Sequence, residues 1–309
     1  MPLPRAAVAG LLLLGLLPMC TPAVPDENRV ATLTALDGLH GWLQNGSDIG
    51  DAAFGFQCLD AWSWFMFSEW HPDAGVRAST AKTVDARLQA LHSPPTWTAV
   101  TLSYWALALR LMAHRALPIE AHLTQLATVD VNDVLTRASR TTRWWTLALL
   151  QQAGASVDAP DPSDTFLAAE LAPGNRDRPM ALSQVYSLYH EIAPAAALGL
   201  APITGLGPEL LEKAHALIVP QMEYAATTGD TDALAEALTT GAILGHRDTD
   251  EYRTGLSTLL ARQNPDGAFR AARDAQRPEL NTDHFRHVVV VATFALLTSL
   301  AEYEPATSG

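Results

Sequence analysis

The sequence consists of about a dozen segments of roughly 10–20 residues in which apolar side chains recur at the three- and four-residue spacing of a helix. Runs rich in glycine, proline, asparagine and serine separate these segments, and we find no long alternation of apolar and polar residues that would indicate a strand. This pattern predicts an all-α fold of stacked helical hairpins, closed into a ring or extended as a solenoid. The predicted helices cover residues 30–43, 52–70, 76–91, 96–114, 119–126, 131–138, 141–153, 180–198, 208–227, 232–244, 250–263 and 284–303.

One long interruption divides the predicted helices into two halves. Residues 154–180 are dominated by glycine, aspartate, proline, serine and asparagine, with a short apolar island at 166–171. We expect a linker or a long loop beside an active site there. The N-terminal half, 26–153, contains all eight tryptophans, and the C-terminal half, 181–305, contains none. Two subdomains, or one ring with an aromatic-rich side, would both fit this difference.

Residues 1–25 have the pattern of an export signal. Arg5 is the only charged residue before Asp26, and residues 6–17 are apolar apart from glycine, which is the length of a signal-peptide core. The Leu-Pro-Met-Cys ending at Cys20 resembles a lipoprotein cleavage box, which would attach the protein to a membrane through a lipid on Cys20. Ordinary cleavage after Ala23 is the alternative. We therefore expect a secreted or lipid-anchored extracytoplasmic protein, or a cytoplasmic one if this segment is not a signal.

Composition and the absence of several motifs narrow the classes of partner. The net charge is −13 and no basic cluster occurs, which argues against a nucleic-acid partner. The chain has only two cysteines, Cys20 and Cys58, so a disulfide framework is not expected, and Cys58 is predicted to be a buried thiol. Nucleotide-binding and serine-hydrolase fingerprints are absent from the sequence. A small molecule or a peptide is the expected substrate.

The stretch Gln263-Asn-Pro-Asp-Gly-Ala-Phe269 resembles the Gln-x-x-Asp-Gly-x-Trp/Phe repeat of the prenyltransferase and squalene-cyclase superfamily, whose members are α/α toroids. The resemblance implies an α/α toroid in which Gln263 ends an outer helix and Asp266-Gly267 forms the following turn. Phe285-Arg-His287, which precedes a long apolar helix, is similar to the Tyr-His of protein prenyltransferase β subunits, where the histidine binds zinc. Asp230 and Asp232 stand upstream as in that family, but the cysteine ligand of the family is missing here.

Residues from about 180 to 300 are also similar to a bacterial α/α-toroid domain of unknown function that is often encoded near natural-product biosynthesis genes. The similarity implies a role in a specialised biosynthetic pathway. Tyr189 stands where that domain usually has threonine, and Arg286 is inserted before the histidine. The similar stretches are Tyr186-Ser-Leu-Tyr-His190, Gly229-Asp-Thr-Asp232, Gln263–Gly267 and Phe285-Arg-His287.

Acids and histidines of the C-terminal half form the candidate site. Asp232 and Glu236 are four residues apart in a predicted helix, so their carboxylates share one face. In a toroid, His190 and His287 would each lie at the inner edge of an apolar helix. Two imidazoles and one or two carboxylates suit an iron or zinc site with open coordination positions. We expect a divalent metal ion (iron, zinc or copper) with His190, Asp232 and His287 as ligands.

Three further residues have predicted catalytic roles. Glu191 or Glu236 would act as a general base or would support the ligands by hydrogen bonds, and Tyr189 would take part in proton transfer. These roles describe a metal-dependent enzyme, although the sequence leaves open whether the protein is an enzyme at all.

Two alternatives remain at this stage. Asp230 could simply cap a helix and Asp232 could complement the helix dipole, in which case the chain would be a binding or scaffold protein of the same fold.

A glycan-acting α/α-barrel lyase or hydrolase would instead use an open groove lined by Trp64, Trp70 and Trp144. Trp62 and Trp64 are two residues apart and cannot share one helix face, so we expect at least one of them to point away from the core or into a cleft.

Overall fold

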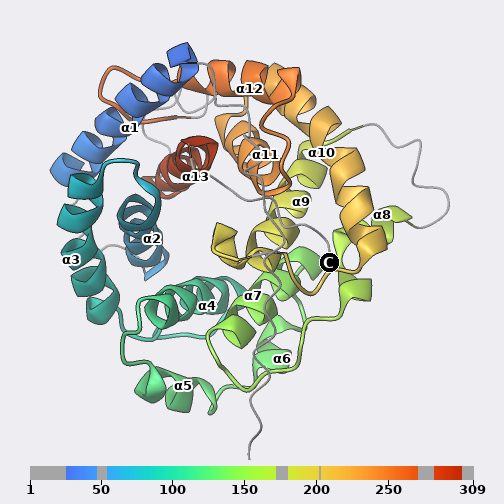
Figure 1. Ribbon diagram of the computed structural model, residues 1–309. Helices are drawn as coiled ribbons and strands as arrows, with labels where there is room; N and C mark the ends of the chain where they lie inside the picture. The colour runs from blue at the N-terminus through green and yellow to red at the C-terminus, as the bar shows by residue number, and fades with distance from the viewer. Residues whose placement is uncertain (1–25, 47–53, 172–179, 202, 271–281, 301–309) are drawn as a thin grey trace, which may run out of the picture.

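The computed structural model describes residues 26–46, 54–171, 180–201, 203–270 and 282–300 (Figure 1). These residues form thirteen α-helices and two short 3-10 helices, and no strand occurs among them beyond an isolated bridge between Gln263 and Phe269. The all-α prediction is confirmed. The α-helices are α1 Asp26–Gly46, α2 Phe54–Trp70, α3 Ala74–Ala90, α4 Ala99–His114, α5 Glu120–Leu126, α6 Val131–Leu135, α7 Arg140–Gln152, α8 Phe166–Leu171, α9 Leu182–Ala195, α10 Pro208–Thr228, α11 Thr231–Ile243, α12 Asp250–Leu260 and α13 Thr282–Leu300.

Six of the helices form an inner ring. Helices α2, α4, α7, α9, α11 and α13 lie around the centre of the molecule in Figure 1, while α1, α3, α5, α10 and α12 lie outside them. Each inner helix contacts the next in chain order, and α13 contacts α2, so the cycle of contacts is closed. This is the layout expected of a ring of helical hairpins rather than of an open solenoid. Membership of the toroid superfamily named above stays a prediction.

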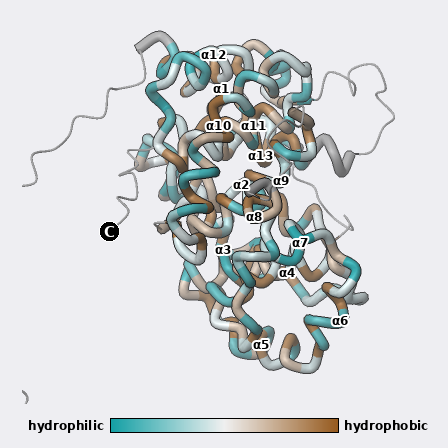
Figure 2. Tube along the Cα trace, turned by 90° about the vertical axis from the view of Figure 1, so that its right-hand side faces the viewer, coloured by the Kyte–Doolittle hydropathy of each residue, from teal (hydrophilic) through white to brown (hydrophobic). Residues whose placement is uncertain are grey.

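The difference between inner and outer helices follows from their sequences. All thirteen residues of α11 are buried, whereas α3 buries only Thr80, Val84 and Leu88. A helix that is apolar on every side belongs in the interior, and one with a narrow apolar stripe belongs on the surface. Figure 2 shows hydrophilic residues recurring along the peripheral helices.

The tryptophans of α2 correct one expectation. Because Trp62 and Trp64 are two residues apart, the sequence suggested that one of them points away from the core or into a cleft, yet they are only 2% and 5% exposed. Trp62 lies against Phe294 of α13, with the ring centroids 5.6 Å apart, and Trp64 lies against His40 of α1 at 5.7 Å. An inner helix has neighbours on both sides, so opposite faces can both be buried.

The turn after α12 closes the outer layer against α1. Gln263 donates from Nε2 to the carbonyl oxygens of Ala35 and Gly267, at 2.8 Å in both cases. Gly267 has a φ of 86° and approaches Gly38 so closely that a Cβ would lie 2.3 Å from the Gly38 carbonyl oxygen. The predicted turn at Asp266-Gly267 is therefore present, and it brings the end of α12 onto the first outer helix.

The predicted interruption at 154–180 is partly structured. It contains a 3-10 helix, Pro162–Asp164, and α8, which coincides with the apolar island and packs against α9 and α10. Residues 172–179 lie outside the described part. The division into an N-terminal and a C-terminal half stays a prediction, and the two halves contact each other where α7 meets α9 and where α13 meets α1 and α2.

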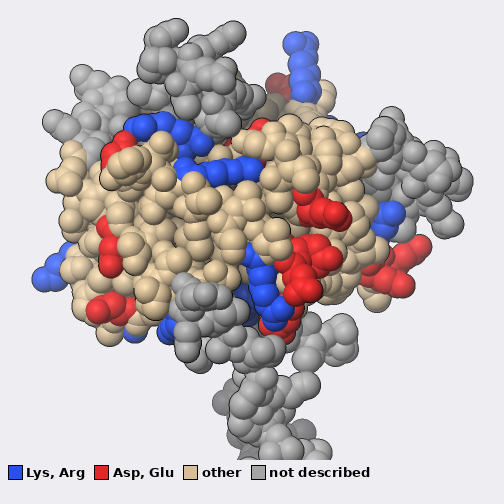
Figure 3. Space-filling view, turned by 90° about the horizontal axis from the view of Figure 1, so that it is seen from above, with Lys and Arg blue, Asp and Glu red and all other residues tan. Residues whose placement is uncertain are grey.

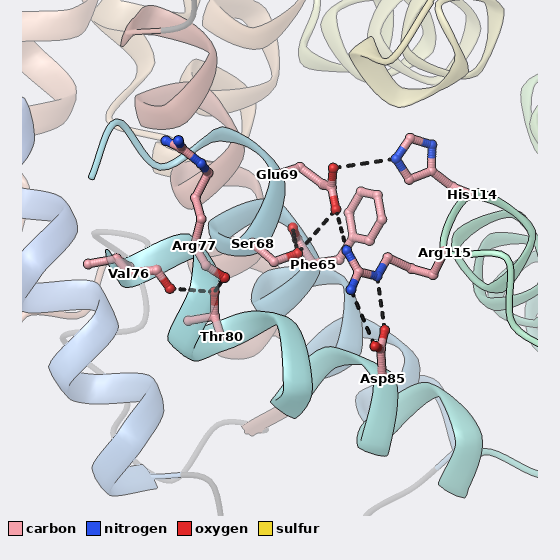
Figure 4. Close-up of polar contacts among 9 residues, drawn as sticks. All are labelled: Phe65, Ser68, Glu69, Val76, Arg77, Thr80, Asp85, His114 and Arg115. Atoms are coloured by element: carbon pink, nitrogen blue, oxygen red, sulfur yellow. Dashed lines mark hydrogen bonds and ion pairs between the residues drawn. The ribbon is translucent and has the colours of Figure 1, made fainter. Parts of the chain in front are cut away.

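Charged residues at the end of α4 connect three helices (Figure 4). Arg115 donates from Nε to Asp85 of α3 and from Nη1 to Glu69 of α2, at 2.9 Å in both cases. His114 lies 3.4 Å from the other oxygen of Glu69. The bidentate contact with Asp85 fixes the planar guanidinium. Opposite charges are paired here, so this cluster has a structural explanation.

The predicted export signal, including Cys20 and Ala23, lies outside the described residues. Within them, no helix is long and apolar enough to cross a membrane. Cys58 is buried as predicted, and burial raises the pKa of its thiol. On the face drawn in Figure 3, basic side chains are scattered among acidic and uncharged ones.

Candidate metal centre

The candidate site forms where the inner helices α9, α11 and α13 meet. Helix α11 begins directly after α10, because Gly229, with a φ of 74°, ends α10 and Asp230 caps α11. One oxygen of Asp230 accepts hydrogen bonds from the backbone nitrogens of Asp232, at 3.1 Å, and Ala233, at 3.2 Å. The predicted capping role of Asp230 is therefore present. From this fixed start, the helical repeat places Asp232 and Glu236 on one side of α11.

His287, near the start of α13, lies between these two acids. Its Nδ1 is 2.9 Å from Oδ1 of Asp232, and its Nε2 is 4.0 Å from Oε1 of Glu236. One ligand atom from each of the three residues can be chosen so that all lie within 4.8 Å of one another. Asp232, Glu236 and His287 therefore form one cluster, in which each imidazole nitrogen faces a different carboxylate.

Glu236 is the most unusual member of the cluster. The residue is fully buried, and neither of its carboxylate oxygens has a hydrogen-bond partner among the described residues. Burial raises the pKa of Glu236 well above its usual range, and the charges of Asp232 and Asp230 raise it further. A buried carboxylate with no partner is costly in its ionised form, so it either stays protonated or meets a cation.

The charge on His287 is set by its neighbour. Burial by itself lowers the pKa of this imidazole, but the charge of Asp232 and the hydrogen bond to it outweigh that effect, and the net pKa is raised. The His287 side chain retains 26% of its exposure, while that of Asp232 retains 6%. The cluster is therefore mainly internal, and the histidine is its most accessible member.

His190 stands close to this cluster but outside it. Its Nδ1 lies 2.7 Å from the carbonyl oxygen of Tyr186, which occupies one ring nitrogen with a backbone acceptor. Burial lowers the pKa of His190 to about 4; the hydrogen bond to Tyr186 and the charge of Asp232 oppose this, while His287 lowers it further. The imidazole is therefore neutral at pH 7, and the charges of both Asp232 and His287 affect its pKa. The structure thus brings together two of the three predicted metal ligands and puts Glu236 beside them.

The two other predicted catalytic residues lie in different surroundings. Tyr189 is 1% exposed, and its hydroxyl has no hydrogen-bond partner in the part of the chain that is described. Burial and the charges of Glu236 and Asp232 all raise the Tyr189 pKa. Glu191, in contrast, directs its carboxylate to α8, where it accepts hydrogen bonds from the backbone nitrogens of Phe166 and Leu167. Its contacts identify Glu191 as a cap of α8.

Two residues near the site, Tyr186 and Trp145, were not among the predicted ligands or catalytic residues. The Tyr186 hydroxyl donates to Oδ2 of Asp230, at 3.2 Å, so one residue anchors His190 through its backbone and the α11 cap through its side chain. Trp145 of α7 packs edge-on against the His190 ring, with centroids 5.2 Å apart. Tyr186 is four residues before His190 in a predicted helix, and this spacing could have indicated that the two lie together. Trp145 lies too far from His190 in the sequence for any such indication.

The fold and the cluster define a ring of helices with acid and histidine side chains between neighbouring inner helices. Residues 63–297 match the model of a family described as Domain of unknown function (DUF6895), and the chain belongs to this family. The match runs from α2 to α13, so it extends much further towards the N-terminus than the similarity seen from about 180 to 300. No curated protein matches the chain. A likeness to prenyltransferases and squalene cyclases stays a prediction.

Proposed function

We propose that Glu236 and His287 bind a divalent metal ion and that the protein is a metal-dependent enzyme acting on a small molecule or a peptide in a specialised pathway. The observation that supports this most strongly is the fully buried Glu236 carboxylate, which has no hydrogen-bond partner among the described residues and faces Nε2 of His287 at 4.0 Å. A divalent cation between the two side chains would supply the positively charged partner that the Glu236 carboxylate lacks among these residues.

The donor atoms suit such an ion. Zinc forms bonds of about 2.0–2.2 Å to imidazole nitrogen and carboxylate oxygen, so two ligands at its tetrahedral angle are about 3.4 Å apart. The Nε2–Oε1 separation is 4.0 Å, and a small side-chain rotation would shorten it to this value. A mixed nitrogen and oxygen site accommodates zinc or iron, and imidazole also suits copper.

Asp232 has a distinct role in this proposal. Its Oδ1 contacts Nδ1 of His287, which leaves Nε2 as the ring nitrogen directed at Glu236. Ligating histidines commonly donate their other ring nitrogen to a carboxylate, which fixes the ring and increases its basicity. Asp232 would thus orient His287, and His190, through Nε2, would approach as an additional ligand.

The remaining side chains would act on the substrate. A bound metal ion polarises a substrate oxygen or activates a water molecule. The Tyr189 hydroxyl, buried and unpaired within the described residues, would donate a hydrogen bond or a proton to the substrate. Tyr186 would hold His190 in place through its carbonyl oxygen.

The test is the metal content and metal affinity of the purified protein, beside three variants. We expect about one iron, zinc or copper ion per chain in the wild type, with at least about tenfold weaker binding in Glu236→Gln and His287→Ala. Glu191→Gln is the matched control, because it neutralises another fully buried glutamate outside the cluster. A wild type that binds none of these metals after reconstitution would overturn the proposal, as would a Glu236→Gln variant that binds iron and zinc as tightly as the wild type.

A non-catalytic binding or scaffold protein is the second candidate. The hydrogen bonds from the backbone nitrogens of Asp232 and Ala233 support it, because they account for Asp230, the acid beside the cluster, as an ordinary helix cap. In that case the contact between Asp232 and His287 stabilises the packing of α11 on α13. His287→Ala would then lower the free energy of unfolding of metal-free protein without any effect on metal binding. The glycan-acting alternative has less support, since Trp64 and Trp144 are only 5% and 3% exposed.

A further inference from the structure

A second pair of histidines lies at the other end of α11. His215 belongs to α10, and His246 lies in the turn that follows α11. Nδ1 of His215 is 2.9 Å from Nε2 of His246, and the ring centroids are 5.2 Å apart with the planes inclined at 48°. At 1.5 Å per helical residue, α11 separates this pair from the Asp232 cluster by about 20 Å.

Both histidines are attached to well-fixed backbone. The nitrogen of His246 donates to Gly241 O at 2.8 Å, and its carbonyl oxygen accepts from the nitrogen of Thr249 at 3.2 Å. His215 lies in the middle of α10, one residue from Ala214 and three from Ile218, which are both fully buried and hold the helix against the core. The two rings are therefore positioned by the fold, and bringing them together costs little conformational entropy.

The charge state of the pair favours metal binding. Burial lowers the pKa of both imidazoles, and the neighbouring His215 lowers that of His246 further. Neutral imidazole is the form that ligates metals. In the metal-free protein, one ring donates its N–H to the other. Transfer of that proton to the outward-facing nitrogen of the same ring gives two lone pairs directed into the space between the rings, and a rotation of each ring would direct both at one ion.

We propose that His215 and His246 form a surface site for a divalent transition-metal ion with square-planar preference, copper(II) or nickel(II). With metal–nitrogen bonds of about 2.0–2.1 Å, two adjacent ligands are about 2.9 Å apart at a right angle and about 3.3 Å apart at a tetrahedral angle. The observed 2.9 Å matches the right angle, which tetragonal copper(II) and nickel(II) adopt. Copper(II) binds more tightly than the other divalent ions of the series.

Access to solvent supports the same conclusion. His215 is exposed and His246 is half-buried, so water can fill the remaining coordination positions. The site joins the outer helix α10 to the turn after α11, and a bound ion would therefore link two elements of the ring. Binding to the folded state alone would raise the midpoint of thermal unfolding.

The experiment adds one equivalent of copper(II) to the untagged full chain and records the electron paramagnetic resonance spectrum together with calorimetric affinity. We expect hyperfine splitting from two equatorial nitrogens in the wild type. His215→Ala and His246→Ala should each weaken binding at least about tenfold and lose one nitrogen. His92→Ala, which removes an exposed histidine elsewhere, should change neither quantity.

Several outcomes would overturn this proposal. One is a wild-type spectrum without nitrogen splitting, which needs no variant to be interpreted. Another is copper binding that is unchanged in both histidine variants, with circular dichroism showing that they are folded. A histidine pair held only by its hydrogen bond would give these results. The same titration in Glu236→Gln separates this site from the metal centre proposed above: the variant should keep copper with two equatorial nitrogens at His215 and His246, and loss of that signal in it would assign the signal to the other centre.

Discussion

Gln263 donates a hydrogen bond from Nε2 to the carbonyl oxygen of Ala35, 228 residues earlier in the chain, at a distance of 2.8 Å. The same amide nitrogen donates to Gly267 O, so one side chain both shapes its own turn and attaches it to α1. The first and the last outer helix of the ring are joined at this point.

Gly267→Ala should destabilise the protein by about 2–4 kcal/mol, because it combines backbone strain at positive φ with a direct clash. The added Cβ would lie 2.3 Å from the carbonyl oxygen of Gly38. Gly154 has nearly the same φ, 85°, but a Cβ added there would meet no atom of the described residues within 4 Å. Gly154→Ala should therefore cost only about 1 kcal/mol. Urea unfolding of both variants measures the difference, and equal losses would contradict a close approach of the turn to α1.

Glu236→Gln should leave the stability of metal-free protein within about 1 kcal/mol of the wild type, because burial already disfavours ionisation of this carboxyl. In the presence of metal the two should differ. A ligand at one hundred times its dissociation constant stabilises a folded protein by about 2.7 kcal/mol, and only the wild type should show this gain. Thermal unfolding with and without the metal provides the measurement. A metal-dependent shift of the same size in the variant would count against Glu236 as a ligand.

Asp232→Asn should weaken metal binding less than Glu236→Gln does. If Asp232 orients His287 without itself binding the ion, the amide oxygen of asparagine can still accept from Nδ1 and only the charge is lost. Removal of such orienting partners typically costs about 10–100-fold in metal affinity. Calorimetric titration of both variants with the metal ion shows which of them binds it more weakly. An Asp232→Asn variant that binds no metal at all would indicate that Asp232 is a ligand.

Glu191 should make the free energy of unfolding depend on pH. Burial raises the pKa of Glu191 to about 7, against the opposing effect of the hydrogen bonds from Phe166 and Leu167. The folded state therefore favours the protonated acid: the stabilisation is complete below the unfolded pKa of about 4.5 and is lost as the pH rises through about 7. From a shift of this size we expect a decrease of the order of 3 kcal/mol.

Glu191→Gln isolates this effect, because glutamine does not titrate. The difference in unfolding free energy between wild type and variant should change between about pH 4.5 and about pH 7.5 and become constant above that range. A difference independent of pH would show that the Glu191 carboxyl titrates normally.

Trp62→Ala should cost about 3–5 kcal/mol, since it leaves a cavity between α2, α7 and α13. Trp62 packs against Phe294 at 5.6 Å and Trp145 at 6.3 Å, and its indole nitrogen is buried without a partner among the described residues. Trp62→Phe keeps most of the packing and removes the unpaired N–H, so its cost should be much smaller. Chemical denaturation compares the two, and similar losses would show that the indole nitrogen makes a stabilising contact.

The helices could be predicted because each depends on local patterns. Asp250 begins α12 after the capping residue Thr249, and the apolar island at 166–171 became α8. The pairing of Asp232 with Glu236 was equally local, since one helical turn fixes it. The choice of histidine was not local. His190 and His287 looked alike in sequence, and only the packing of α13 on α11 placed His287 between the two acids.

The sequence also could not show how completely the inner helices are covered. A period of 3.6 residues distinguishes one face from another, but it does not show whether a second helix covers the opposite face. Trp64 is buried because α1 and Arg87 cover it, and neither is near it in sequence.

The closed cycle of inner helices has a consequence for how the molecule tolerates rearrangement. In an open array, a terminal repeat can be removed at the expense of one interface, whereas here the loss of any hairpin would expose two apolar flanks at once. Helix α1 already contacts α13. The stability of the ring should therefore depend more on keeping every contact between neighbouring helices than on the order in which the six inner helices follow one another in the chain. A circular permutant, in which the two termini are joined and the chain is opened between two hairpins, should fold into the same ring. A chain from which one hairpin is deleted should not.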